Sequence, residues 1–383
     1  MKIINVKNTS ADEVIAKTIK VLNLGGLIVF PTETTYGAGV DATNNEAVKK
    51  LLAYKIRREG KPLSIAVSDK KMAAEYVFIN DQADSLFKQF LPGPVTVVCK
   101  VLHKEDDNSA KNLVLSPKSL TPTDQSLAPG VASEFQTLGI RIPNYQLILN
   151  LIEKYQKPIT ATSANASGKK RPYSIDDIFK NASAKQKDLI DLVLDAGELP
   201  HNDPSTVIDT TLSTPVTLRG GLNKNNPVFE ANQKTQLISN SEEETQEIAG
   251  RLLLKDWNEI IKNGLIVALN GNLGTGKTIF TKGVAKFLNI QETIKSPTYS
   301  YIEEYDFTRH QTTGKLFHLD MWKVEDKNMF DRLEIESLIG KNNIIVIEWF
   351  DQISKFIDSK FKNTKIVKIL ISQYKNKRTL EIS

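Results

Sequence analysis

Eight consecutive residues could form a phosphate-binding loop. The segment Gly271–Thr278 reads G-N-L-G-T-G-K-T and directly follows the apolar run Leu265–Leu269. In such a loop, backbone N–H groups turn toward phosphate oxygens, the lysine reaches the terminal phosphates and the last hydroxyl binds magnesium. A helix over Thr278–Leu288 would add its positive end. The predicted ligands of ATP and Mg²⁺ are therefore Gly271, Gly274, Thr275, Gly276, Lys277 and Thr278, the last of these on the metal.

Two acidic residues in the same half follow short apolar runs. Asp320 ends Leu316–Leu319, and Glu348 ends Ile344–Ile347. Both residues follow the predicted phosphate-binding loop along the chain. We therefore interpret Asp320 as a metal ligand and Glu348 as a catalytic residue. Either carboxylate alone would also fit a helix cap or a surface group. The nearby segment Ser296–Tyr299 could sense the nucleotide or simply form a proline turn.

In the first half of the chain, cationic and hydroxyl residues gather where short apolar strands end. The cations of this set are Lys55, Arg57, Lys61, Arg141 and Arg219. Open α/β sheets place ligands at strand ends, and guanidinium and ammonium groups suit a polyphosphate. Taken singly, Lys55 and Arg57 would fit a solvated helix face, and Ser163 and Asn165 a turn or a helix cap.

The pattern of helices and strands expected around these residues predicts an α/β fold with two domains. A helix is expected over Ala11–Leu22, and strands over Gly26–Phe30, Pro62–Val67 and Val95–Val101. The domains are expected at 1–222 and 236–383, joined by a polar linker at 223–235. An acidic helix start follows the linker, with Ser241 as cap and Glu244 closing a capping box. We also expect a long loop at 103–133 and an edge hairpin formed by Lys365–Ser372 and Arg378–Ile382.

Composition excludes several classes of protein. The chain has 383 residues, 40% hydrophobic and 25% charged, with a net charge of +5, which is too small for an obligate nucleic-acid footprint. No apolar run reaches membrane-spanning length and the opening lacks the apolar core of a signal peptide, so a cytoplasmic protein without membrane contact is expected. Cys99 is the only cysteine, which excludes an intrachain disulfide, and we expect it in a strand core.

The order of motifs in the first half resembles the YrdC/TsaC family of threonylcarbamoyl-AMP synthases, over about residues 11–222. In chain order the motifs are K-x-R at Lys55, L-P-G-P-x-T at Leu91, G-x-R-x-P at Gly139, A-T-S-A-N-x-S-G at Ala161 and S-T-V-I-D at Ser205. The resemblance implies a twisted mixed α/β sheet. It also implies an enzyme that joins L-threonine, bicarbonate and ATP into threonylcarbamoyl-AMP and pyrophosphate.

The same resemblance assigns roles to individual residues. Lys55 and Arg57 would stabilise the charge of the transition state, with Lys61, Arg141 and Arg219 as further cations. Thr32, Tyr36, Ser163 and Asn165 would hold the substrates, and Pro143 would line the nucleotide pocket.

The second half resembles the TsaE family of small P-loop ATPases, over about residues 236–383. The resemblance rests on the phosphate-binding loop, S-P-T-Y at Ser296, H-L-D-M-W at His318 and the pair Glu348–Trp349. It implies a bifunctional protein of tRNA threonylcarbamoyladenosine synthesis whose second half hydrolyses ATP. A TsaD-type transferase, with or without a TsaB-type protein, would complete the transfer to tRNA, which the chain itself would contact only indirectly or transiently.

Two other functions compete with this interpretation. The chain could be a nucleotide-dependent RNA-binding or regulatory protein without synthase activity. Carbamoyl transfer in hydrogenase maturation uses a related domain, but the cysteines expected there are absent.

The second half also shows no obvious arginine aimed at the γ-phosphate. Arg309 and Arg332 are candidates that would equally fit solvated faces.

Overall fold

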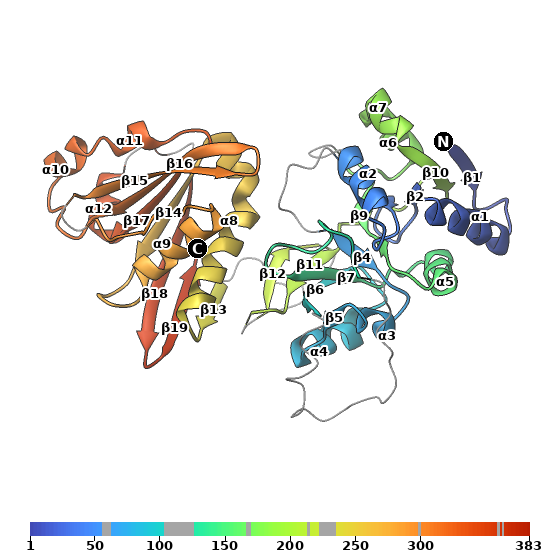
Figure 1. The fold of residues 1–383 in the computed structure, drawn as a ribbon, viewed down its shortest axis with the longest axis horizontal. Coiled ribbons are helices and arrows are strands. Elements are labelled where there is room, and N and C mark those ends of the chain that lie inside the picture. The colour runs from blue at the N-terminus through green and yellow to red at the C-terminus, as the bar shows by residue number, and fades with distance from the viewer. Residues whose placement is uncertain are drawn as a thin grey trace. The chain divides into compact units, whose positions relative to one another are not determined.

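The chain divides into two compact units in a computed structural model (Figure 1). The structure describes residues 1–55, 63–102, 126–165, 170–212, 215–221, 235–297, 300–357, 361 and 364–383. The first unit holds Met1–Thr211 and the described residues 215–221, and the second holds the described residues from 235 onward. Each unit combines mixed β-sheet with helices, which confirms the predicted α/β class. In the described residues, no helix is long and apolar enough to cross a membrane.

The first unit contains two mixed sheets. One has the order β1-β10-β2-β3-β9, and the other the order β12-β11-β6-β7-β4-β8 with β5 paired to β6. The strands of the first sheet are β1 Lys2–Asn5, β2 Leu27–Phe30, β3 Gly37–Gly39, β9 Thr162–Ser163 and β10 Ile190–Asp195. Those of the second are β4 Ser64–Ala66, β5 Val77–Phe78, β6 Val95–Val101, β7 Thr137–Arg141, β8 Ile159–Thr160, β11 Thr206–Asp209 and β12 Val216–Arg219.

Amphipathic helices cover these sheets. They are α1 Ala11–Asn23, α2 Asn45–Lys55, α3 Lys70–Ala73, α4 Asp81–Phe90, α5 Gln146–Tyr155, α6 Ile175–Asn181 and α7 Ala184–Asp188. Helix α1 begins where the Ser10 side chain accepts a hydrogen bond from the Glu13 N–H, and it buries Val14 and Leu22. Cys99 lies in the strand core as predicted, and burial raises the pKa of its thiol to about 12. It is therefore unsuited to nucleophilic chemistry.

The second unit is built on one sheet with the order β13-β19-β18-β14-β17-β16-β15. Its strands are β13 Thr235–Ser239, β14 Leu265–Asn270, β15 Ile302–Arg309, β16 Thr312–Asp320, β17 Ile344–Glu348, β18 Lys365–Tyr374 and β19 Lys377–Ile382. The four strands β16, β17, β14 and β18 run parallel. Their carboxyl ends therefore share one edge, where α/β proteins bind ligands.

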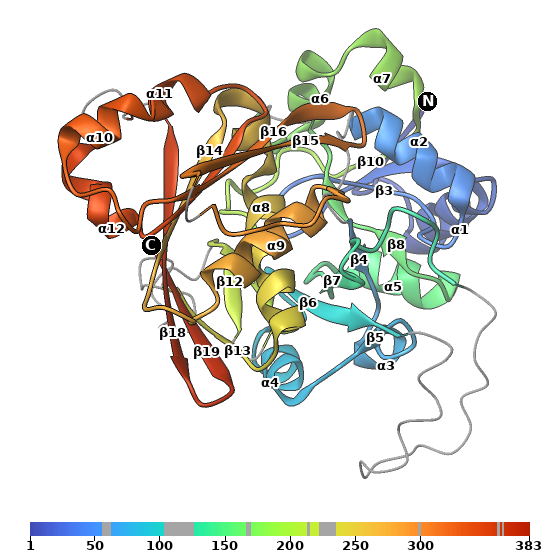
Figure 2. The same cartoon turned by 60° about the vertical axis from the view of Figure 1, so that its left-hand side comes forward.

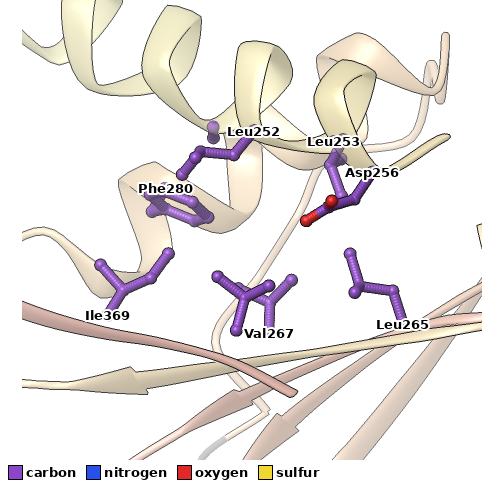
Figure 3. Close-up of a pocket in the computed structure, with 9 residues that line it drawn as sticks. Leu252, Leu253, Asp256, Leu265, Val267, Phe280 and Ile369 are labelled. Atoms are coloured by element: carbon purple, nitrogen blue, oxygen red, sulfur yellow. The ribbon is translucent and has the colours of Figure 1, made fainter. Parts of the chain in front are cut away.

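Helices cover both faces of this sheet. They are α8 Glu242–Asn263, α9 Lys277–Phe287, α10 Lys327–Arg332, α11 Ile335–Leu338, α12 Phe350–Ile353 and the 3₁₀ turn η3 Ser354–Phe356. On one face, Leu253 of α8 and Phe280 of α9 point toward Val267 and Ile369 of the sheet (Figure 3). Ile266 and Ala268 face the other side, where they form a cluster with apolar residues of α10, α11 and α12. These three helices lie together beside the sheet (Figure 2).

Two expectations about this unit are wrong in detail. The tail hairpin is not an edge, because β13 pairs with β19 and takes the edge position itself. At the start of α8, the Ser241 side chain accepts from the Glu244 N–H as expected, but the Glu244 carboxylate accepts from the backbone N–H of Asn240 instead of closing the box on Ser241. Most of the predicted linker, residues 223–234, lies outside the described residues, as do residues 103–125 of the predicted loop.

Candidate functional site

The phosphate-binding loop lies between β14 and α9, as the sequence predicts. Gly271, Gly274 and Gly276 have φ angles of +141°, +79° and +105°, which residues with a side chain rarely adopt. A Cβ built on Gly271 would also lie 2.1 Å from the carbonyl oxygen of Ile371. The glycines therefore allow the loop to turn tightly over the end of β18 and to begin α9 directly.

Lys277 lies inside this loop. Its Nζ donates to the carbonyl oxygens of Gly271 and Asn272, at 2.8 and 2.9 Å, and lies 3.9 Å from the centre of a Trp349 ring. Desolvation lowers the pKa of the ammonium, while the negative charges of Glu348 and Asp320 act in the opposite direction. A terminal phosphate would offer this cation stronger acceptors than the carbonyls.

The two predicted acids lie side by side at the ends of neighbouring parallel strands, since Asp320 of β16 is in register with Glu348 of β17. Glu348 Oε1 accepts from Thr278 Oγ1 at 3.0 Å and pairs with His318 Nε2 at 2.8 Å. Asp320 Oδ2 accepts from Ser296 Oγ at 3.0 Å. The structure therefore brings the loop hydroxyl and both carboxylates to one place.

The donor set of this region fits a nucleotide with magnesium. Mg²⁺ binds hard oxygen ligands and commonly takes one or two carboxylates, with phosphates completing the shell. Thr278 and Asp320 supply such oxygens beside the loop. Within the described ranges, no group of three or more His, Cys, Asp and Glu side chains is placed to hold a metal without help, so the phosphates would have to contribute.

In the first unit, the loop after β2 forms the centre of the second candidate site. Thr32 Oγ1 donates to the Thr35 carbonyl at 2.7 Å and accepts from the N–H groups of Thr34 and Thr35. Tyr36 is fully buried, and its hydroxyl donates to the Gly197 carbonyl at 2.7 Å. Desolvation raises the pKa of Tyr36 to about 12, which keeps the phenol neutral. This geometry makes Tyr36 a residue that positions the loop.

Lys55, the last residue of α2, connects this helix to the end of β9 and the residues that follow it. Its Nζ donates to the carbonyl oxygens of Ser163 and Asn165, at 2.6 and 2.5 Å. Ser163 is in register with Gly37 of β3, and Ser163 Oγ donates to Asn165 Oδ1 at 2.6 Å. Lys55 therefore holds Ser163 and Asn165 beside the Thr32–Tyr36 loop.

Arg141 contacts the same loop. Arg141 Nη2 donates to Glu33 Oε1 at 2.9 Å and to Thr34 Oγ1 at 2.7 Å. Its Nε, like Glu33 Oε2, is buried and has no hydrogen-bond partner in the described part of the chain. Such atoms are costly to bury, so their presence favours a site that a polar ligand completes.

Arg219 extends this cationic group. Its guanidinium donates to the Ser205 carbonyl at 3.0 Å and to Ser205 Oγ at 2.8 Å. The pKa of Arg219 is lowered by desolvation and, after that, by the positive charges of Arg141 and Arg171. Although the residue as a whole is exposed, its head group packs against Ser205. An anion would relieve the repulsion among these three guanidinium groups.

The structure therefore gathers most of the predicted site residues into two groups, one in each unit. Pro143 is buried two residues after the end of β7. Arg57, Lys61 and the Thr298–Tyr299 part of the S-P-T-Y motif lie outside the described residues. Arg309 is 3% exposed, and its guanidinium donates to the Phe287 carbonyl and stacks on that ring. The expectation of a solvated face is wrong there, whereas Arg332 is exposed.

Sequence reasoning gave no role to three polar residues at these sites. Glu33 pairs with Arg141, and His318 pairs with Glu348. The third, Arg378, packs against Gly276 of the phosphate-binding loop. His318 had a signal in the sequence, because residues two apart on a strand share a face and His318 precedes Asp320 by two.

Two family models match the chain, one over most of each unit. The Sua5/YciO/YrdC model, described as "Telomere recombination", matches residues 20–221, more than half of the chain. The chain belongs to this family. A second model, described as "Threonylcarbamoyl adenosine biosynthesis protein TsaE", matches residues 239–380. The first unit is thus the Sua5/YciO/YrdC domain and the second unit a TsaE domain.

Individual relatives of the Sua5/YciO/YrdC domain agree with this assignment. A Methanocaldococcus jannaschii protein is 33% identical over 203 residues, which cover 53% of this chain and 83% of the relative. A protein named threonylcarbamoyl-AMP synthase from Pyrococcus abyssi is 31% identical over 220 residues, 57% of each chain. This chain therefore spans only about half the length of the Pyrococcus relative. The crystal structure of P. abyssi Sua5 complexed with L-threonine has 19% identity and a TM-score of 0.49, and covers 96% of this chain and 99% of its own.

Proposed function

We propose that the Sua5/YciO/YrdC domain makes threonylcarbamoyl-AMP and pyrophosphate from L-threonine, bicarbonate and ATP. The observation that carries the proposal is the contact of Arg141 with Thr34 in a loop of threonine hydroxyls, with unpartnered buried atoms on Arg141 and Glu33. Arg171 and Arg219 lie close enough for the charges of Arg141 and Arg171 to lower the pKa of Arg219. This arrangement suits an anion with several phosphate oxygens. The name of the Pyrococcus abyssi relative supports the same reaction.

The reaction needs positioning and charge stabilisation. The threonine amine and bicarbonate form a carbamate with loss of water, and a carbamate oxygen then attacks the α-phosphorus as pyrophosphate leaves. Negative charge spreads over the phosphate oxygens in the transition state, and fixed cations stabilise it. We assign this role to Arg141 and Arg219, with Arg57 and Lys61 as further cations. Lys55 acts by holding Ser163 and Asn165 in place, since both of their carbonyls accept from its Nζ.

We further propose that the TsaE domain hydrolyses ATP. Lys277 would bind the terminal phosphates, Thr278 and Asp320 would hold Mg²⁺, and Glu348 would orient or deprotonate the attacking water. Magnesium would supply neutralisation of phosphate charge at this position. The contact of Thr278 with Glu348 and the register of Glu348 with Asp320 support placing these three residues at one site.

The two activities belong to one process in this proposal. The threonylcarbamoyl group would pass from the adenylate to tRNA through a separate TsaD-type transferase, with or without a TsaB-type protein, and ATP hydrolysis in the TsaE domain would support that transfer. The support is the presence of both family domains on one chain. The chain itself would meet tRNA only indirectly or transiently.

The deciding experiment incubates the purified chain with labelled threonine, bicarbonate and ATP, and follows both the adenylate and pyrophosphate. Pyrophosphate release should depend on threonine and bicarbonate together, and Arg57→Ala should reduce it about a hundredfold, because a charge-assisted phosphate contact is lost. Release that continues unchanged without threonine would overturn the synthase proposal.

A further inference from the structure

One buried arginine of the TsaE domain lies directly against the phosphate-binding loop. Arg378, on β19, is 8% exposed. A Cβ built on Gly276 would lie 2.7 Å from Arg378 Nε and 3.0 Å from its Cδ. Two features therefore favour glycine at position 276. Its φ is +105°, and the Arg378 side chain fills the space that a Cβ would occupy.

The charge of Arg378 is poorly compensated by the protein. Its Nε has no hydrogen-bond partner among the described residues. Nη2 lies 3.9 Å from Glu242 Oε1, and the Glu242 side chain is 59% exposed. Gly276 caps α9, so the guanidinium also lies near the positive end of that helix. A buried cation beside another positive group is unfavourable unless an anion joins them.

The order of the strands indicates which part of a nucleotide this cation would meet. Asp320 and Glu348 end β16 and β17 on one side of β14, whereas Arg378 belongs to the β18–β19 hairpin on its other side. The γ-phosphate has to face the two acids for hydrolysis. A triphosphate that follows the loop to the start of α9 then brings its α-phosphate to the β19 side.

We propose that Arg378 is a nucleotide-binding residue of the TsaE domain whose guanidinium binds the α-phosphate of the bound adenine nucleotide. The inference rests on the proposed nucleotide site at Lys277. It explains why a guanidinium is buried without a close carboxylate next to Gly276. It also separates two roles: Lys277 acts at the terminal phosphates, where bond cleavage occurs, and Arg378 acts mainly on affinity.

The test measures ADP binding with Mg²⁺ by tryptophan fluorescence in the full chain. The three tryptophans, Trp257, Trp322 and Trp349, all lie in the TsaE domain, so the signal excludes nucleotide bound at the first unit. Arg378→Met keeps volume without charge, and Lys377→Met on the same strand is the matched exposed control. Arg378→Met should weaken ADP binding about ten- to hundredfold and raise KM for ATP with little change in kcat, while Lys377→Met should stay within about twofold.

Thermal unfolding without nucleotide distinguishes a nucleotide-binding role of Arg378 from a purely structural role. For a binding residue, Arg378→Met should keep or raise Tm, because it removes a desolvated charge. Unchanged ADP affinity in Arg378→Met would overturn the inference. The inference would also be overturned if Arg378→Met lowered both the ADP affinity and Tm, and Arg378→Lys restored neither. If the unsubstituted chain bound no ADP in this assay, the proposed nucleotide site itself would be wrong.

Discussion

The imidazole Nε2 of His318 lies 2.8 Å from Glu348 Oε1, and both side chains are almost completely buried. The other ring nitrogen, Nδ1, has no partner within the described residues. Nε2 is the donor in this contact, because a carboxylate oxygen accepts. His318 thus fixes the orientation of the carboxylate that also accepts from Thr278.

The first prediction is that His318→Ala slows ATP hydrolysis by the TsaE domain about ten- to hundredfold. Glu348 would lose the donor that orients it, and a buried hydrogen bond to a charged group contributes about 1.5–3 kcal/mol. Phosphate release at saturating ATP measures the effect. Adenylate synthesis in the same preparation is the internal control and should not change. Full ATPase activity in His318→Ala would show that Glu348 needs no such support.

The second prediction concerns the desolvated Lys277. Lys277→Met should abolish ATP hydrolysis, leave adenylate synthesis intact and raise Tm in the absence of nucleotide. Burial lowers the pKa of Lys277 in the folded state, so over the window between that pKa and the ordinary lysine value of about 10.4 the unfolded chain binds more protons. Stability of the unsubstituted chain therefore rises with pH in that window, and below it the full cost of the buried charge remains.

The measurement is Tm of both forms between about pH 7 and 10. The advantage of Lys277→Met should shrink as pH approaches the ordinary lysine pKa. A gap in Tm that does not change with pH would mean that the substitution acts through packing. If Lys277→Met stopped adenylate synthesis in a folded protein, one nucleotide site would serve both reactions, contrary to the proposal.

The third prediction tests whether Arg141 acts through the planar guanidinium group or only through its charge. Its Nη2 donates to both Glu33 and Thr34, while Nε, in the same rigid plane, is buried without a hydrogen-bond partner in the described part of the chain. A lysine has only one nitrogen, so it cannot keep both contacts and also offer a second nitrogen to a phosphate oxygen. Arg141→Lys should therefore reduce adenylate synthesis about tenfold or more, and Arg141→Ala further. Pyrophosphate release with varied ATP measures both, with the ATPase of the TsaE domain as control for folding. Equal activity of Arg141→Lys and the unsubstituted chain would assign Arg141 only a charge, without a directional contact.

The grouping of the candidate site residues in the TsaE domain could be predicted because its parts are local. The phosphate-binding loop is contiguous, and Asp320 and Glu348 each follow an apolar run that parallel pairing brings to one edge. Arg378 could not be found this way, because its neighbour Gly276 lies far from it along the chain. Strand β13 was missed since it starts at the end of a polar segment and is stabilised by pairing with the distant β19.

The Sua5/YciO/YrdC domain was harder to predict in detail. Its site is assembled from short segments, and the contact between Lys55 and the carbonyls of Ser163 and Asn165 spans more than 100 residues. Only the order of motifs indicated that these residues belong together. The buried position of Tyr36 also depends on Gly197, which no local pattern connects to it. Cations were recognisable by type, but their partners, such as Glu33, required the tertiary fold.

The last prediction is that ATP hydrolysis by the TsaE domain is slow alone and rises when a TsaD-type transferase is added. The γ-phosphate side offers Lys277, but the candidate Arg309 is held by Phe287, and Arg332 lies exposed on α10. A missing cation can be supplied in trans by a partner, which typically accelerates hydrolysis strongly. Phosphate release should therefore rise with transferase concentration and saturate, whereas adenylate synthesis should not respond.

Arg332→Ala is the matched variant for this titration. If Arg332 completes the site within the chain, its loss should lower the basal rate. If the cation comes from the partner, the basal rate and the stimulated rate should both survive the substitution. Tryptophan fluorescence, or co-purification, establishes that the transferase binds under the same conditions. A flat titration with bound partner would mean that the site is already complete, and the partner-coupled role of the TsaE domain would be wrong.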